Sequence, residues 1–160
     1  MKDILNKKNI EKYSRQIVIK KIGIAGQKKI INSRILVVGA GGLGCPVIDY
    51  LSRAGVGTIG IADNDKVNIS NIHRQSLFDL KDVGKFKADI IKKKIRLINS
   101  DSKIITFKKK ITKKNIFKII KNFEIIVDGS DNFKTKFLLN KFSIKYKKIL
   151  IVGAISKFDG

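Results

Sequence analysis

The sequence predicts an α/β fold: a doubly wound, Rossmann-like and mostly parallel sheet with helices on both faces. A short run of apolar, mostly β-branched residues at 35–38 is followed by four glycines within six residues, and then by an amphipathic helical stretch. A second apolar run, 59–62, ends in Asp63, about twenty residues past the glycines, where a ribose-binding acid belongs. This order of strand, glycine turn, helix, strand and acid indicates a nucleotide-binding βαβ unit, because the helix N-terminus offers backbone N–H groups to phosphate.

The elements on either side of this unit alternate between helix and strand. Residues 1–32 are expected to form a helical segment, with apolar side chains at helical spacing over 9–22, interruptions at Gly23 and Gly26, and a second short turn at 25–32. Residues 33–160 are expected to form the Rossmann-like core of a single domain that spans 1–160. Further strands are expected at 103–107, 125–127 and 149–152, and further helices at 84–98, at 112–120 with Thr112 as the N-cap, and at 134–146.

The last residues, 153–160, are typical of a turn and the start of another strand. Nothing in the sequence closes the sheet edge that 149–152 would form. The chain is therefore expected to be truncated, either as a fragment or by an early stop.

The composition excludes several classes of protein. No apolar run approaches the length of a membrane span, so we expect a cytoplasmic protein with no membrane partner. The only cysteine, Cys45, and the only histidine, His73, leave neither a disulfide nor a zinc-ligand set.

The net charge of +22 would suit a nucleic-acid-binding protein. However, only five of the 35 basic residues are arginines, and the lysines accompany the isoleucine-rich, proline-poor composition that is typical of an AT-rich genome. We therefore expect lysine runs such as 108–110 to be solvated surface, and no specific nucleic acid to be a partner.

Two kinds of reaction could use the nucleotide site. An NAD-dependent oxidoreductase would need Asp63 for the ribose and a proton donor near its substrate, and the only histidine, His73, lies in the long polar stretch 64–81. An ATP-dependent adenylating enzyme needs cations for a polyphosphate and a carboxylate for Mg²⁺, but no general base, because the attacking carboxylate is already ionised at neutral pH. The ATP hypothesis is favoured, because the chain supplies such a set in segments that are expected near the carboxyl ends of strands. The set is Arg74, Lys87, Asp128 and Asp131.

Six motifs, in order along the chain, resemble those of the ThiF/MoeB/HesA family, the bacterial relatives of ubiquitin-activating enzymes. They are 13–17 (YSRQI), 39–44 (GAGGLG), 63–65 (DND), 70–75 (SNIHRQ), 83–88 (VGKFKA) and 128–132 (DGSDN). The resemblance implies ATP-dependent adenylation of the C-terminal glycine carboxylate of a small ubiquitin-like sulfur-carrier protein ending in Gly-Gly, with release of pyrophosphate. Such carriers serve molybdopterin or thiamine biosynthesis, and the sequence does not distinguish the two.

The resemblance also implies roles for individual residues, matched position by position. The catalytic set would be Arg15, Arg74, Lys87 and Asp131, with Asp131 also binding Mg²⁺. The nucleotide-binding set would be Gly39, Gly41, Gly42, Gly44, Asp63, Asp65, Ser70, Asn71, Arg74, Lys87, Asp131 and Asn132. In the family, the arginine that matches Arg15 reaches into the partner subunit's site, which implies a homodimer. Cys45 is expected to pack rather than react, and Lys136 stands where the family often has arginine.

The chain departs from the family at its end. The family continues into a second half that carries further strands and paired C-x-x-C motifs for a structural Zn²⁺, and these zinc ligands are absent from the sequence. An alternative on the same fold is a dehydratase of threonylcarbamoyladenosine in tRNA, which would make use of the basic charge. The segments 13–16 and 42–44 favour the sulfur-carrier branch.

Overall fold

The sheet at the centre of the molecule has five strands, all parallel within the described residues, in the order β3-β2-β1-β4-β5. The computed structural model describes residues 5–155 and 160. The chain runs outward from β1 to β3 and then returns to the other side of β1 for β4 and β5. This order confirms the predicted doubly wound fold and creates a switch point between β1 and β4. The strands are β1 (Arg34–Val38), β2 (Thr58–Ala62), β3 (Lys103–Phe107), β4 (Ile125–Asp128) and β5 (Ile149–Val152).

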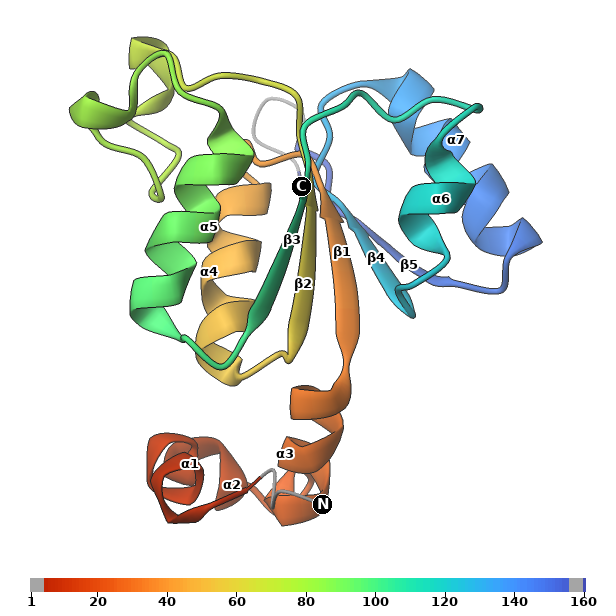
Figure 1. Ribbon diagram of the computed structural model, residues 1–160. Coiled ribbons are helices and arrows are strands. Elements are labelled where there is room, and N and C mark those ends of the chain that lie inside the picture. Colours follow the sequence, from red (N-terminus) through yellow and green to blue (C-terminus); the bar gives the residue numbers. More distant parts are fainter. Residues whose placement is uncertain (1–4, 156–159) are drawn as a thin grey trace.

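Helices cover both faces of the sheet (Figure 1). On one face lie α4 (Gly44–Ala54) and α5 (Lys87–Ile98), and on the other lie α6 (Ile116–Ile120) and α7 (Phe133–Lys145). Alternate residues of β1 serve the two layers: Ile35 and Val37 join the core under α4 and α5, whereas Leu36 and Val38 join the core under α6 and α7. A strand buried on both faces must be apolar throughout, which explains the unbroken apolar run at 35–38.

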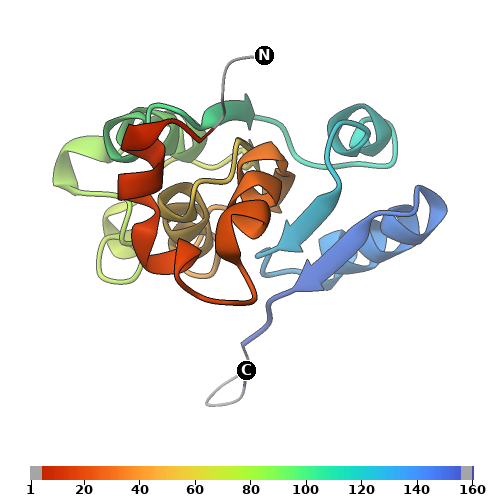
Figure 2. The ribbon, with the colours of Figure 1, turned by 90° about the horizontal axis from the view of Figure 1, so that it is seen from below.

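The N-terminal helical segment lies at the amino ends of the strands, as Figures 1 and 2 show from two directions. It consists of α1 (Lys7–Lys12), α2 (Ser14–Ile17) and α3 (Gly23–Asn32). The helical stripe predicted over 9–22 is therefore broken into two short helices. The prediction that Gly26 interrupts a helix is wrong, because Gly26 lies inside α3.

Polar contacts fix this segment to the helices α4 and α5. The side-chain amides of Gln16 and Gln27 both donate to the carbonyl of Ala54, the last residue of α4, at 2.9 and 3.0 Å. The hydroxyl of buried Tyr13 accepts a hydrogen bond from Nδ2 of Asn99, which caps the end of α5, at 3.1 Å. The N-terminal helices are thus an integral part of the described fold.

The connection from β2 to α5 contains two short 3₁₀ turns, η1 (Ile69–Asn71) and η2 (Leu80–Asp82), each closed by a capping box. Helix α5 begins at Lys87 rather than at the predicted residue 84. The reason is that Gly84 has φ +84° and Phe86 pairs with Lys66 in an isolated antiparallel bridge, so the backbone just before Lys87 is not helical.

The start of α6 also differs from the prediction. Thr112 is not the N-cap, because the helix begins at Ile116 and is preceded by Asn115. The Asn115 side chain instead accepts a hydrogen bond from the backbone N–H of Thr112 at 2.8 Å and donates one to the carbonyl of Lys110 at 2.9 Å. The side chain that organises this loop is therefore Asn115.

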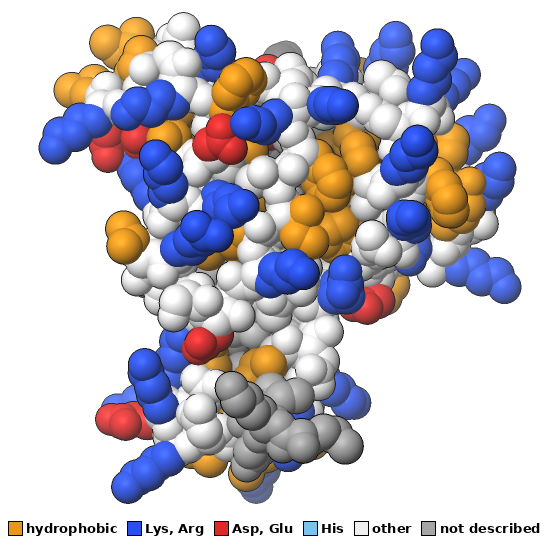
Figure 3. Space-filling view, in the orientation of Figure 1, with side chains coloured by type: hydrophobic (Ala, Val, Ile, Leu, Met, Phe, Trp, Pro, Cys, Tyr) orange, Lys and Arg blue, Asp and Glu red, His pale blue; other side chains and the backbone are white. Residues whose placement is uncertain are grey.

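Basic side chains are scattered over the face of the molecule in Figure 3, from the N-terminal segment to both helical layers. This distribution agrees with the expectation that most lysines are solvated surface. Within the described residues, the structure has no helix that is both long enough and apolar enough to span a membrane.

Candidate functional site

A cavity of about 960 Å³ opens at the carboxyl ends of the strands, at the switch point between β1 and β4. Its walls come from the glycine loop after β1, the turn after β2, the connection that ends at Lys87, the segment after β3 and the turn after β4, with a contribution from residues after β5. Residues distant in sequence therefore meet around one space. Among the residues expected to bind nucleotide or to act in catalysis, those that line it are Gly39, Gly41, Gly42, Asp63, Asp65, Asn71, Arg74, Lys87, Asp131 and Asn132.

Four of the expected residues do not line the cavity. One of them, Asp128, is fully buried at the end of β4. A Cβ on Gly44 would lie 1.9 Å from the carbonyl oxygen of Gly39, so this glycine allows α4 to start directly against the loop. Ser70 is exposed in η1 and contributes its backbone carbonyl, which accepts a hydrogen bond from Arg74 Nη1 at 2.7 Å. Arg15 is exposed on α2, at the opposite ends of the strands from the cavity.

The glycine loop lies in contact with the turn after β4. Gly39 has φ +87°, a conformation that suits glycine, and a Cβ there would lie 2.8 Å from the carbonyl oxygen of Gly129. Gly41 and Gly42 follow on the cavity surface. A side chain at position 39 would force the two loops apart, so the glycine is needed for the floor of the cavity to form.

Asp63 ties the end of β2 to the glycine loop. Its Oδ2 accepts a hydrogen bond from the backbone N–H of Ala40 at 2.7 Å, and its Oδ1 accepts one from the N–H of Asp65, also at 2.7 Å. Burial raises the pKa of the Asp63 carboxyl above its usual value, although these two N–H donors and the Lys87 charge oppose the rise. Each carboxylate oxygen retains acceptor capacity toward the cavity.

Two cationic side chains, Lys87 and Arg74, line the cavity together with Asp63. Lys87 is buried, and its Nζ lies 3.7 Å from Oδ2 of the exposed Asp65. Arg74 is exposed, and its Nη1 also lies 3.0 Å from Nε2 of His73. In this structure Lys87 has an acidic neighbour that a polyphosphate could replace, because a phosphate is a stronger, multidentate acceptor.

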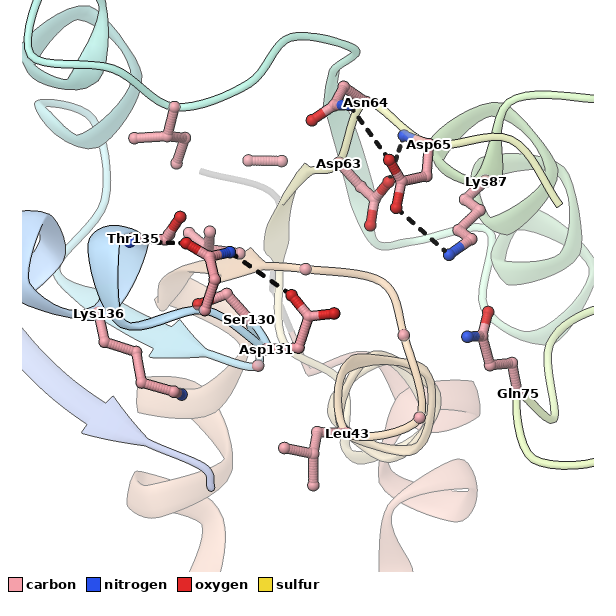
Figure 4. A pocket seen from close by; sticks show the side chains of 18 of the residues that line it. Leu43, Asp63, Asn64, Asp65, Gln75, Lys87, Ser130, Asp131, Thr135 and Lys136 are labelled. Atoms are coloured by element: carbon pink, nitrogen blue, oxygen red, sulfur yellow. Dashed lines mark hydrogen bonds and ion pairs between the residues drawn. The ribbon is translucent and has the colours of Figure 1, made fainter. Parts of the chain in front are cut away.

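Asp131 faces Lys87 from the opposite wall (Figure 4). It follows β4 in the turn that also carries Ser130, and its carboxylate points into the space between the walls. Leu43, at the end of the glycine loop, lies between the two walls. The Lys87 ammonium on one side and the Asp131 carboxylate on the other suit a ligand with both phosphates and a bound cation.

Sequence reasoning missed several residues of the cavity. Gln75 lines it beside the glycine loop and is 3% exposed, and its Oε1 has no hydrogen-bond partner among the described residues. Lys109 and Lys110 are exposed, as expected for solvated lysines, but they also line the cavity together with Ile111. Their place directly after β3, at the carboxyl end of a parallel strand, is the signal that could have identified them.

Residues 13–160 match the ThiF family. A curated relative, the sulfur carrier protein adenylyltransferase of Thermus thermophilus, is 38% identical over 154 residues, which are 96% of this chain and 57% of that protein. The chain thus spans a little more than half the length of this relative.

Two solved structures have the same architecture. Escherichia coli MccB, solved with AMPCPP and MccA, is 27% identical with a TM-score of 0.80, over 89% of this chain and 44% of that one. E. coli tRNA N6-threonylcarbamoyladenosine dehydratase TcdA, solved with ATP, is 24% identical with a TM-score of 0.86, over 97% of this chain and 64% of that one. At that identity, the likeness to TcdA shows the fold alone.

The family match confirms the resemblance carried by the six sequence motifs, and it extends over nearly the whole chain. In the described fold, five of the six motifs lie toward the carboxyl ends of the strands, and the motif at 13–17 lies in the N-terminal segment. This chain therefore belongs to the ThiF family.

Proposed function

We propose that this chain binds ATP with Mg²⁺ and forms the adenylation site of an enzyme that activates the C-terminal glycine carboxylate of a small ubiquitin-like sulfur-carrier protein. The arrangement of charge around the cavity carries this proposal: Lys87 and Asp131 face each other across it, and Arg74 and the glycine loop also line it. The relative from T. thermophilus is named for this activity, and the MccB structure contains AMPCPP together with MccA. A cytoplasmic location is part of the same proposal.

The reaction requires positioning and charge stabilisation rather than proton transfer. An oxygen of the carrier's terminal carboxylate attacks the α-phosphorus, a new P–O bond forms, and the bond to the leaving pyrophosphate breaks. The attacking carboxylate is ionised at neutral pH, so no general base is needed. Lys87 and Arg74 would stabilise the charge that develops on the pyrophosphate, and Asp63 would accept a hydrogen bond from the ribose. Asp65, Asn71 and Asn132 would complete the nucleotide contacts.

The residues present fit Mg²⁺ but not Zn²⁺. The described residues contain no group of three or more His, Cys, Asp or Glu side chains that could hold a metal ion. Mg²⁺ is commonly held by one or two carboxylates together with substrate phosphates, and Asp131 supplies such a carboxylate. When bound, the ion would neutralise phosphate charge. The structural zinc of the family would need paired cysteines, and this sequence has Cys45 alone.

Calorimetry tests the choice of nucleotide. We expect the chain to bind Mg-ATP more tightly than NAD, because the cavity offers cations for a polyphosphate. Lys87→Met should weaken Mg-ATP binding about 10- to 100-fold, since a buried charged donor is lost. Lys93→Met, on the exposed face of the same helix, is the matched control and should change nothing. Tighter binding of NAD than of Mg-ATP would overturn the adenylation proposal.

Arg15 requires a second copy of the chain if it acts in catalysis. It lies on α2, at the far ends of the strands from its own cavity, so only the cavity of another copy is open to it. We therefore propose a homodimer, with Arg15 of one copy entering the cavity of the other. Sedimentation should show a dimer, and Arg15→Met should weaken Mg-ATP binding in it, whereas Arg96→Met should not. A monomer with unchanged Mg-ATP binding on Arg15→Met would refute this part.

The adenylyl acceptor is tested by ATP–pyrophosphate exchange in the presence of a carrier that ends in Gly-Gly. Exchange that depends on the carrier, and that a carrier lacking the last glycine does not support, is the expected result. Carriers of the molybdopterin type and of the thiamine type should be compared side by side. RNA-selective binding at submicromolar concentration, with no exchange, would instead favour the tRNA-modifying branch.

A further inference from the structure

The carboxylate of Asp128, at the end of β4, is fully buried and organises the turn that follows it. Its Oδ1 accepts two hydrogen bonds from Ser130, one from the backbone N–H at 2.9 Å and one from the hydroxyl at 2.6 Å. A buried carboxylate without a cationic partner is strongly destabilising, so this arrangement needs a counter-charge.

Lys136 supplies that counter-charge from the first turn of α7. Its Nζ lies 3.4 Å from Asp128 Oδ2 and donates a hydrogen bond to the carbonyl of Gly153 at 2.7 Å. The lysine side chain is 18% exposed and lines the cavity wall. One ammonium group therefore connects the end of β4, the helix α7 and the residue that follows β5.

These contacts enclose the turn from both sides and leave the Asp131 carboxylate available to the cavity. On the helix side, Asn132 caps α7 by accepting a hydrogen bond from the N–H of Thr135 at 2.9 Å. On the strand side, Ser130 is fixed by Asp128. The hydrogen bond to Asp131 in this turn is a long one from Asn132 Nδ2, at 3.5 Å. Figure 4 shows the Asp131 carboxylate directed away from Lys136 and into the open space.

We propose that Lys136, acting through Asp128 and Ser130, is a positioning residue that holds the Asp131 carboxylate in place for a metal-bound nucleotide. The proposal rests on the function proposed above, and it adds a role for the pair of buried Asp128 and partly buried Lys136. The family often has arginine at this position. Either side chain can pair with Asp128 and donate to the Gly153 carbonyl, so the lysine can make the same two contacts.

A simple structural role is the alternative, and the two roles differ in their dependence on Mg²⁺. If Lys136 only holds the fold together, its loss should weaken ATP binding equally with Mg²⁺ and with EDTA. If it positions Asp131, the loss should appear with Mg²⁺ and nearly disappear in EDTA, because without the ion the Asp131 carboxylate has no ligand to hold. Calorimetric ATP binding in the two buffers, with the melting temperature of each variant, separates these cases.

For Lys136→Met we expect ATP affinity in Mg²⁺ to fall about 10- to 100-fold, the usual effect of removing a group that orients a metal-binding side chain. Affinity in EDTA should stay within about twofold of the wild type, because the phosphates still meet Lys87 and Arg74. Lys136→Arg keeps the charge and should restore binding to within about threefold. Lys134→Met, an exposed position on the same helix, is the matched control and should leave both affinities unchanged.

Two double variants separate a loss of stability from a loss of the Mg²⁺ response. Asp128→Asn combined with Lys136→Met removes both charges, so it should recover melting temperature relative to Lys136→Met alone, but it should not recover the response to Mg²⁺. Lys136→Met combined with Asp131→Asn should be no weaker than Asp131→Asn alone, because both changes act through one carboxylate.

The outcomes are distinguishable from a failure of the proposed function. A wild-type chain that does not bind Mg-ATP would overturn the proposed function and this inference with it. If the wild type binds and Asp131→Asn abolishes the Mg²⁺ response, but Lys136→Met loses affinity equally in both buffers or in neither, only the positioning role is wrong.

Discussion

At the scale of one residue, burial outweighs the effect of the helix N-terminus on the pKa of the Cys45 thiol. It stands in the first turn of α4, where the helix N-terminus would favour a thiolate, but its side chain is fully buried. Burial raises the pKa of the thiol to about 11, and the opposing contributions of the Leu77 N–H and the Lys87 charge are smaller. The thiol donates to the carbonyl of Ala40 at 3.4 Å. It packs behind the glycine loop, as expected from the sequence.

Cys45 should therefore resist alkylation in the folded chain. At pH 8 the raised pKa leaves roughly 100-fold less thiolate than in the unfolded chain, so iodoacetamide labelling followed by mass spectrometry should be slower by at least about that factor without urea. The neutral thiol stabilises the fold fully below the unfolded value of 9.0, and this contribution is lost as pH rises through about 11. Fast labelling of the native chain would contradict this account.

At the scale of an element, ion pairs with Lys94 attach the connection 63–86 to α5. Lys94 Nζ lies 2.9 Å from a carboxylate oxygen of both Asp79 and Asp82, which close η2. Burial lowers the pKa of Lys94, but its hydrogen bonds to the two aspartates outweigh this and raise it overall. The Lys94 hydrogen bond in turn lowers the pKa of Asp79. The same connection carries Arg74 and Gln75 to the cavity.

Lys94→Met should loosen this connection without unfolding the sheet. Amide hydrogen exchange over 79–82 should become faster, while Lys93→Met should leave it unchanged. The lowered pKa of Asp79 gives stability above its usual value of 3.8 that is lost as pH falls through the lower folded value, so the wild-type connection should also loosen in acid. Unchanged exchange in Lys94→Met at neutral pH would show that the turns are held by their capping boxes alone.

At the scale of the whole molecule, the described sheet ends in an apolar edge. The exposed fractions of Ile149, Ile151 and Val152 in β5 are 60%, 52% and 53%, and the outer edge of β5 pairs with no other described strand. On α7, the rings of Phe133 and Phe137 are stacked at 6.3 Å and are also exposed. Exposed apolar edges of this kind are sites of association.

We expect the 160-residue chain to self-associate through this edge at high concentration. Ile151→Lys should lower the weight-average mass measured by light scattering, because a charge on an edge strand opposes pairing with another chain. Leu97→Lys, at an isolated leucine of α5 that is 89% exposed, is the control and should have little effect. Equal effects of the two variants would assign the association to general hydrophobicity rather than to the edge.

The sequence by itself determined the fold class and much of the site. The apolar run at 35–38, the glycines and the acid at 63 are local signals, each dictated by the backbone geometry of a βαβ unit. The alternation of strands and helices then placed Arg74, Lys87 and Asp131 near the carboxyl ends of strands, and the structure brings all three to one cavity. Such placement follows from topology, so it could be predicted without coordinates.

Only the tertiary structure decided which polar side chains form ion pairs and hydrogen bonds with one another. No local pattern shows that Lys87 lies beside Asp65, that Asn115 rather than Thr112 organises the start of α6, or that Gly44 serves packing. The pairing of Lys136 with Asp128 and with the carbonyl of Gly153 joins three elements in the same way. These contacts depend on distances between elements, and a lysine in a chain with so many lysines becomes distinctive only when the fold buries it beside a carboxylate.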